Sequence, residues 1–186
     1  MAQGFKYSRS RPNPLHACIA ALDGIVLRMK QPGKKYNPRD FYNRKGYFAF
    51  PVQAAVDSNY RFLTFSAMAM GCTHDSTAHA MSNLGEYLRN ENLPGQFWIA
   101  GDEAYTLTES LLIPFSANMA PRGSFNDAFN FFHSSMRIHV EQAFGTFVNR
   151  WRIFHGALAF SVENIFAFIK AALLLHNFCM DARRSR

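Results

Sequence analysis

The sequence predicts an α/β domain in which helices flank a mixed β-sheet. Three features carry this prediction: an apolar, β-leaning run at residues 18–29, two further strand-like runs joined by a turn sequence, and two long apolar helical segments in the last third of the chain. Hairpin-linked strands followed by a helix, another strand and two helices are typical of a mixed sheet with helices packed on it. The chain of 186 residues is long enough for one domain with its own core.

The first elements are strands. Residues 1–15 are polar and basic, and we expect them to form a flexible lead-in. Residues 18–29 predict a buried strand, because apolar and β-branched side chains dominate the run. Residues 47–56 and 61–70 predict a hairpin, since Asp57-Ser58-Asn59 between them is a turn composition.

A helix and a short strand follow. Residues 77–89 have apolar side chains at helical spacing, and Thr77 is a suitable N-cap. Residues 97–100 predict a short buried strand that ends at Gly101-Asp102.

The clearest helix is predicted to begin near Ser134. Its apolar stripe recurs at steps of three or four residues and consists of Val140, Phe144, Phe147, Trp151 and Phe154. A last helix is expected from Ser161 to about Cys179, apolar on most sides and therefore buried. The expected organisation is a lead-in over residues 1–15, one domain over residues 16–180 and a basic tail over residues 181–186.

The composition is that of a folded protein with a positive charge. Hydrophobic residues make up 48% and charged residues 18%, which excludes a disordered chain. The formal net charge of +7 favours a polyanionic partner such as nucleic acid, although a merely soluble basic protein has the same property.

The cysteines and the apolar runs indicate an intracellular protein without a membrane span. Three widely spaced cysteines do not form a disulfide framework, and Cys72 with His74 and His79 lacks the second pair of a zinc site. The most apolar run, residues 165–179, is interrupted by Lys170 and His176 and is shorter than a membrane helix. No secretory signal is visible.

Three acids lie at unusual places. Asp23 interrupts an apolar strand, where a charge needs a partner, unless it lies at the solvent edge or a bulge. Asp102 follows a strand end, where ligands of open sheets bind, although Gly-Asp is also a common turn. Glu141 follows buried Val140, so it lies at the border of the apolar face; alternatively it forms an ordinary surface ion pair with Arg137.

Together the three acids favour a metal site. Clustered carboxylates repel one another, and a hard divalent cation stabilises such a cluster. We therefore expect Asp23, Asp102 and Glu141 to be catalytic and to bind Mg²⁺ or Mn²⁺, with two ions acting on a phosphodiester. Asp75 is a further candidate, but His74-Asp75-Ser76 is also a turn and helix-entry sequence.

Basic residues predict where nucleic acid binds. The densest stretch, residues 30–45, interleaves cations with aromatic side chains, which suits phosphate contacts and base stacking; a solvated loop is the alternative. The residues predicted to bind nucleic acid are Lys34, Lys35, Arg44, Lys45 and Arg137, although Arg137 could instead orient Glu141. The Arg-rich tail suits DNA contact or nuclear import.

Short motifs in a fixed order resemble the PIF/Harbinger transposases and the nucleases derived from them, the DDE superfamily endonucleases. The resemblance runs from about Ala20 to Phe178. Its motifs are Asn43-Arg44-Lys45-Gly46, Gly71 with His74-Asp75-Ser76, Gly101-Asp102 with Tyr105, Val140-Glu141-Gln142-Ala143-Phe144-Gly145, Arg150-Trp151-Arg152 and Leu175-His176-Asn177-Phe178.

This resemblance implies an RNase H-like fold with Asp23, Asp102 and Glu141 as the catalytic triad. It also implies DNA as substrate, phosphodiester hydrolysis that a competent transposase follows with strand transfer, a separate DNA-binding protein as partner, and a nuclear location, with the cytoplasm as the alternative. The oligomeric state is left open.

The chain departs from the family pattern at two places. Ile25 and Val26 follow Gly24 where the family has Thr and His, and Glu103 and Ala104 follow Asp102 in place of small residues. The N-terminal region of a full transposase is not seen, as in a truncated copy or an incomplete gene model. The alternative to an endonuclease is therefore a catalytically silent, domesticated or truncated domain that binds DNA or protein; cleavage of RNA is a third reading.

Overall fold

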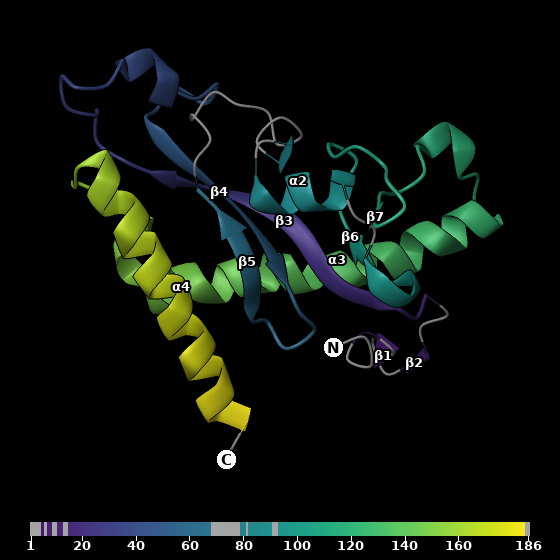
Figure 1. Ribbon diagram of the computed structural model, residues 1–186. Helices are drawn as coiled ribbons and strands as arrows, with labels where there is room; N and C mark the ends of the chain where they lie inside the picture. The colour runs from purple at the N-terminus through teal and green to yellow at the C-terminus, as the bar shows by residue number, and fades with distance from the viewer. Residues whose placement is uncertain are drawn as a thin grey trace.

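The computed structural model describes residues 5, 7–8, 11–12, 15–67, 79–80, 82–90 and 93–184. Its centre is a five-stranded sheet in the order β5-β4-β3-β6-β7 (Figure 1). The strands are β3 (Cys18–Arg28), β4 (Ala49–Val56), β5 (Phe62–Ser66), β6 (Trp98–Ala100) and β7 (Leu111–Leu112). The pairs β3–β4 and β4–β5 are antiparallel, whereas β3–β6 and β6–β7 are parallel. The sheet is therefore mixed, as the sequence predicts.

Helices cover both faces of this sheet. In Figure 1, α3 (Phe125–Arg150) runs behind the strands, α2 (Asn83–Asn90) lies in front of them, and α4 (Val162–Arg184) crosses near the β5 edge. A five-stranded mixed sheet with this order and flanking helices is an RNase H-like fold, so the predicted fold class is confirmed.

The two faces of the sheet hold separate parts of the core, because neighbouring strand residues point to opposite sides. Ala21 belongs to the larger cluster, which α3 and α4 cover, whereas Leu22 belongs to the cluster beneath α2. The predicted stripe of α3 is part of the larger cluster, where Val140, Phe144 and Phe147 are buried. This burial fixes the rotation of α3 about its axis.

The hairpin between β4 and β5 is confirmed, and α4 holds it in place. Asp57 Oδ1 accepts hydrogen bonds from the backbone N–H groups of Asn59 (2.8 Å) and Arg61 (3.0 Å), which closes the turn. The side-chain amide of Asn177 donates to the carbonyl oxygen of Phe62 and accepts from its N–H, both at 2.8 Å. Asn177 thus pairs with the backbone of the edge strand as another strand would.

Both long helices differ from the prediction at their ends. Helix α3 ends at Arg150, so Trp151 and Phe154 of the predicted stripe lie beyond it, Phe154 in a 3₁₀ helix (Arg152–His155). Helix α3 begins at Phe125 instead of near Ser134, and its N-cap is Ser124, whose Oγ accepts from the N–H of Asp127 at 3.1 Å. The first turns lack a single apolar face, since Phe125 and Phe131 are both exposed, and this hid them from the periodicity. Helix α4 ends at Arg184, not at Cys179.

Some expected features differ or fall outside the described residues. The predicted lead-in contains the two-stranded sheet of β1 (Tyr7–Ser8) and β2 (Arg11–Pro12), and Phe5 is buried against Cys18, Trp98 and Met136. The sequence did not predict β1, β2 or β7, which are too short to show a pattern. The expected N-cap Thr77 and the group Cys72, His74, Asp75 and Ser76 lie outside the described residues.

Helix α4 also bears on the expected absence of a membrane span. Its segment Val162–Arg183 has 22 residues and is long and apolar enough, by length and composition, to cross a membrane. The argument from length is therefore wrong, because the helix continues past the apolar run that was counted. Core helices that are mostly buried pass the same test. Helix α4 contributes Ile165, Ile169 and Leu173 to the core, but only 28% of the tested window is buried, so the expectation of a helix buried on most sides is wrong. The absence of a membrane span stays a prediction.

Candidate active site

The three acids singled out in the sequence lie around one guanidinium group, that of Arg137 on α3. Its Nη2 atom lies 3.2 Å from Asp23 Oδ2, 3.8 Å from Asp102 Oδ2 and 3.8 Å from Glu141 Oε1. Since each of these oxygens lies within 3.8 Å of the same atom, no two of them can be further apart than twice that distance. A strand, a strand end and a helix therefore deliver the three carboxylates to one place.

Asp23 lies within β3 and points toward α3. It faces Ala54 of β4 in the register, while pairing with β6 ends two residues earlier, at Ala21. Its Oδ1 accepts from the N–H of Gly24 at 2.7 Å, and its Oδ2 accepts from Arg137. Asp23 is therefore not a solvent-facing acid at an edge or bulge.

The surroundings of Asp23 act on its pKa in both directions. Burial of the carboxylate is the largest effect and raises the pKa, and the charges of Asp102 and Glu141 raise it further. The N–H of Gly24 and the charge of Arg137 lower it, but the net result is a raised pKa. A cation bound beside Asp23 would therefore stabilise the charged form of its carboxylate.

Asp102 is placed by the end of β6, which is parallel to β3. Gly101 leaves room for this turn, because a Cβ atom there would meet Leu111 Cδ1 at 3.0 Å and Tyr105 Cδ2 at 3.2 Å. Asp102 Oδ1 accepts from the N–H of Ala104 at 2.8 Å, whereas Oδ2 faces Arg137. Asp102 is thus both a turn residue and a member of the cluster.

Glu141 is the most exposed of the three acids. Its side chain is 56% exposed, against 22% for Asp23 and 28% for Asp102. It lies four residues after Arg137, on the same side of α3, and next to buried Val140. The predicted ion pair with Arg137 is present, but it is part of a larger cluster. Glu103, in contrast, is exposed.

The donor set fits a hard divalent cation. Three carboxylates offer only oxygen atoms, which are the ligands that Mg²⁺ and Mn²⁺ prefer. Within the residues that the structure describes, no three His, Cys, Asp or Glu side chains stand in an arrangement that could hold an ion as they are. The positive charge at the centre of the cluster belongs to Arg137, which the sequence assigned to nucleic-acid binding.

His133 anchors this part of α3, and the sequence analysis missed it. It lies one helical turn before Arg137, is buried, and its Nε2 contacts the carbonyl oxygen of Leu112 in β7 at 2.9 Å. Its ring stacks on those of Trp98 and Phe129. Burial is the main cause of its lowered pKa, and the charge of Arg137 adds to it. The sequence signal that could have revealed His133 is its position four residues before Arg137, on the same side of the helix.

The basic loop over residues 30–45 ends in a tight turn built by Asn43. The buried side chain of Asn43 accepts from the N–H groups of Lys45 (2.9 Å) and Tyr47 (3.5 Å), and Gly46 adopts a φ of 84°. Arg44 and Lys45 lie between these two residues and are exposed. The turn therefore presents two of the predicted nucleic-acid-binding residues to solvent.

Elsewhere in the loop, Lys34 is exposed, whereas Lys35 forms an ion pair with Glu163 in the first turn of α4. Lys35 Nζ lies 2.6 Å from Glu163 Oε1, and the hydroxyl of Tyr36 donates to the same oxygen at 2.5 Å. These bonds, that of Lys35 first, lower the pKa of Glu163 to about 2. The loop is thereby tied to the start of α4.

One aromatic side chain of the loop stays open to solvent. Phe41 is buried, Tyr36 packs edge-on against it, and Arg28 lies over the ring of Tyr47 at 4.5 Å. Tyr42 is 49% exposed and lines a shallow hollow of about 230 Å³ together with Pro38, Arg39 and Phe48. An exposed ring beside an arginine is the combination on which an unstacked base packs.

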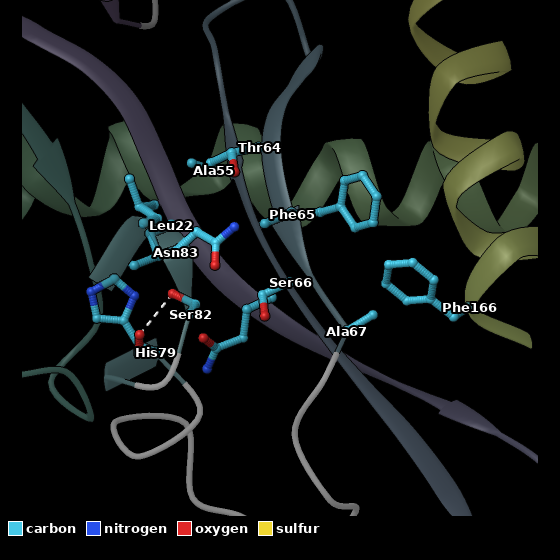
Figure 2. Close-up of a pocket in the computed structure, with 13 residues that line it drawn as sticks. Leu22, Ala55, Thr64, Phe65, Ser66, Ala67, His79, Ser82, Asn83 and Phe166 are labelled. Carbon is cyan, nitrogen blue, oxygen red and sulfur yellow. Dashed lines mark hydrogen bonds between the residues drawn. The ribbon is translucent and has the colours of Figure 1, made fainter. Parts of the chain in front are cut away.

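None of the three acids lines the cavity that Figure 2 shows. It has a volume of about 210 Å³, and Leu22, His79 and Asn83 line one side while Phe65 and Phe166 lie on the other. Among its described lining residues none is charged. Leu22 and Asp23 point to opposite faces of β3, so this cavity is separate from the carboxylate cluster.

His176 and Asn177, which belong to one of the family-like motifs, have structural contacts. His176 is fully buried, and its Nε2 lies 2.9 Å from the carbonyl oxygen of Tyr60. Arg150 Nη1 donates to the carbonyl oxygen of His176 at 3.3 Å, which joins the ends of α3 and α4. The interpretation of His176 as a core histidine is therefore confirmed.

Comparison with known proteins agrees with this architecture. The profile of the DDE superfamily endonuclease family matches residues 22–177, which include Asp23, Asp102 and Glu141, and the chain belongs to this family. It is 26% identical to "Protein ALP1-like" of Arabidopsis thaliana over 88% of its own length and 43% of that protein. It is 25% identical to "Putative nuclease HARBI1" of Rattus norvegicus and of Mus musculus, over 88% of the chain and 46% of each relative.

The chain spans about half the length of these curated relatives. No solved structure gives a significant match to it. The predicted resemblance to the DDE superfamily endonucleases of transposase descent is confirmed.

Proposed function

We propose that this chain is a divalent-metal-dependent DNA endonuclease of transposase descent, in which Asp23, Asp102 and Glu141 hold Mg²⁺ or Mn²⁺. The observation that carries the proposal is the meeting of these three acids, from three separate elements, around a single cationic group. Family membership supports an endonuclease of this type, and the matched span contains all three acids.

The residues have different parts in this proposal. Two bound ions would activate the attacking water and stabilise the leaving oxygen of the phosphodiester. Asp23, on the central strand, and Asp102, held by its turn, give two fixed sets of carboxylate oxygens. Glu141 is more exposed and so adjusts most easily to ions and substrate. In a competent transposase the same chemistry would then serve strand transfer.

The basic loop gives a path for the DNA. Strand β3 leads from Asp23 to Arg28, about 16 Å at about 3.3 Å per residue, and the loop follows. Duplex DNA lying along this direction would bring its phosphates to Lys34, Lys35, Arg44 and Lys45. A nuclear location, a separate DNA-binding protein as partner and an oligomer belong to this proposal as well.

A supercoiled plasmid tests the function directly. The purified chain is incubated with plasmid in Mg²⁺, Mn²⁺ or EDTA, beside an Asp102→Asn variant and a matched Glu103→Gln variant. We expect metal-dependent nicking by the wild type and by Glu103→Gln, since Glu103 is exposed, and none by Asp102→Asn. Nicking that Asp102→Asn retains would show that the activity comes from elsewhere.

The second candidate is a catalytically silent domain that binds DNA or protein. The departure after Gly24 favours it, because Ile25 and Val26 offer neither the hydroxyl nor the imidazole of the family pattern. A folded protein that binds DNA but does not nick it with either ion would support this candidate.

A further inference from the structure

Arg137 is surrounded by negative charge but makes few hydrogen bonds. Asp23 Oδ2 is at hydrogen-bond distance, 3.2 Å, whereas the oxygens of Asp102 and Glu141 lie beyond it at 3.8 Å. The Nε atom of Arg137 is buried and has no hydrogen-bond partner among the described residues. A guanidinium has five N–H donors, so this one is held mainly by charge and only loosely by geometry.

Charge makes this position incompatible with bound metal ions. The carboxylates that face Nη2 are the same three that the proposed function assigns to the ions. Divalent cations bound to these oxygens would lie within a few ångströms of a positive guanidinium, and like charges at that separation repel strongly where water is partly excluded. Arg137 and the ions therefore compete for one set of ligands.

We propose that Arg137 is an internal counter-cation, which keeps the three carboxylates together in the absence of metal and leaves them when metal binds. The proposal rests on the proposed metal site and adds a regulatory feature to it. Arg137 lowers the repulsion among Asp23, Asp102 and Glu141 before metal arrives, so the site is assembled in advance. The same contacts weaken metal binding, because part of the binding free energy is used to displace Arg137.

Direct measurement of Mn²⁺ binding, without DNA, tests the competition. Free Mn²⁺ is followed by electron paramagnetic resonance in titrations of the full chain, Arg137→Gln, Arg137→Lys and Arg122→Gln. Arg122 is the matched control, because it is exposed and precedes α3, whose axis rises about 18 Å from Phe125 to Arg137. The substitution Arg122→Gln removes one positive charge and leaves the carboxylate cluster unchanged.

We expect Arg137→Gln to bind Mn²⁺ more tightly than the wild type, on the order of tenfold, within the usual range of coupling between two ligands. Arg122→Gln and Arg137→Lys should stay near the wild-type value, since the first leaves the site intact and the second keeps its charge. Equal or weaker binding by Arg137→Gln would overturn the proposal while leaving the metal site standing. Absence of binding by every protein would overturn the metal site itself, and the proposal with it.

Thermal unfolding gives a second measurement without catalysis. In EDTA, Arg137→Gln should unfold at a lower temperature than the wild type, because three carboxylates lose their counter-cation. Saturating Mn²⁺ should then raise its Tm by more than it raises that of the wild type. Equal Tm values in EDTA, or equal gains with Mn²⁺, would contradict the proposed role.

A measurement that does not use Arg137→Gln covers the case in which that variant does not fold. The ¹⁵N NMR signal of the Arg137 Nε–H group is assigned by its loss in Arg137→Lys and followed during titration with Mg²⁺. Displacement from the carboxylates predicts a progressive shift of this signal. A signal that stays unchanged at saturating Mg²⁺ would overturn the proposal.

Discussion

Asp102 uses its two carboxylate oxygens for different purposes. Oδ1 accepts the N–H of Ala104 and closes the turn after β6, whereas Oδ2 faces Arg137. The residue is therefore structural and a candidate ligand at once. These two roles can be separated by substitution, because an amide keeps the acceptor oxygen and loses the charge.

We predict that Asp102→Asn keeps the stability of the protein and that Asp102→Ala does not. The amide oxygen of Asn can still accept from Ala104, whereas Ala removes the bond and costs about 1 kcal/mol of the free energy of unfolding. Urea denaturation of both variants in EDTA, with Glu103→Ala as the exposed neighbour, measures the difference. Equal losses in Asp102→Asn and Asp102→Ala would show that the turn does not depend on this oxygen.

Single residues differ in how far the sequence reveals them. Asp23 could be found, because an acid inside an apolar run violates the usual pattern of a strand, and the resemblance to a family gave the same residue. Arg137 could be paired only with Glu141, four residues away on the same helix. Its contacts with Asp23 and Asp102 depend on how α3 lies across the sheet, which local spacing does not determine.

Among the elements, the basic loop over residues 30–45 is the one for which the structure adds most to what the sequence predicts. The sequence shows an alternation of cations and aromatic rings, without saying which rings face solvent. The structure shows that Phe41 is buried, that Tyr36 is bonded to Glu163 and that Tyr47 lies under Arg28, so Tyr42 is the exposed ring. The hollow beside Tyr42 is therefore the part of the loop where stacking can be tested.

We predict that Tyr42→Ala weakens binding of single-stranded DNA by about 1–3 kcal/mol, the usual contribution of one stacked base. The salt dependence of binding should stay the same, because no charge is lost. Arg44→Gln should instead lower the salt slope by about 0.7, the value for one phosphate contact on a single strand. Fluorescence anisotropy over a range of salt concentrations, in EDTA, measures both quantities.

Tyr87→Ala, which removes an exposed ring from α2, is the control for Tyr42→Ala. Equal effects of the two substitutions would show that the hollow has no special part in binding. Tyr42→Phe should bind as the wild type does, since it keeps the ring.

The two long helices show why boundaries are harder to predict than stripes. The stripe was visible because Val140, Phe144 and Phe147 are buried on one face of α3. The first turns of α3 and the last turn of α4 pack less regularly, so their ends depend on caps and contacts. Ser124, a good N-cap residue ten positions before the predicted start of α3, was the signal that periodicity alone overlooked.

For the molecule as a whole, two buried histidines join distant parts of the fold. His133 ties α3 to β7, and His176 ties α4 to the turn between β4 and β5. Burial lowers the pKa of both, and the charge of Arg137 beside His133 and those of Arg150 and Arg183 near His176 lower them further. Both rings are therefore neutral in the folded protein at neutral pH.

We predict that the protein loses stability as the pH falls below about 6.5. In that range the unfolded chain takes up protons on both histidines at their ordinary pKa, while the folded protein does not. Each histidine then lowers the free energy of unfolding by up to about 1.4 kcal/mol per pH unit, until the pH reaches its lowered folded pKa. Tm values between pH 7 and 5 measure the trend.

His176→Gln should flatten this pH dependence, and His155→Gln, at an exposed position, should leave it unchanged. A Tm that stays constant or rises between pH 7 and 5 would contradict the prediction that these two rings are held neutral.

The central claim is that the carboxylates of this fold bind the ions that cut DNA, and exchanging one ligand tests it most directly. In Asp102→Cys a soft thiolate replaces a hard carboxylate, and Mg²⁺ binds thiolates poorly, whereas softer divalent ions such as Cd²⁺ accept them. We predict that Asp102→Cys does not nick supercoiled plasmid with Mg²⁺ and regains part of the activity with Cd²⁺, whereas Asp102→Asn regains none. Undiminished nicking by Asp102→Cys with Mg²⁺ would contradict the account, because Asp102 would then not hold the metal.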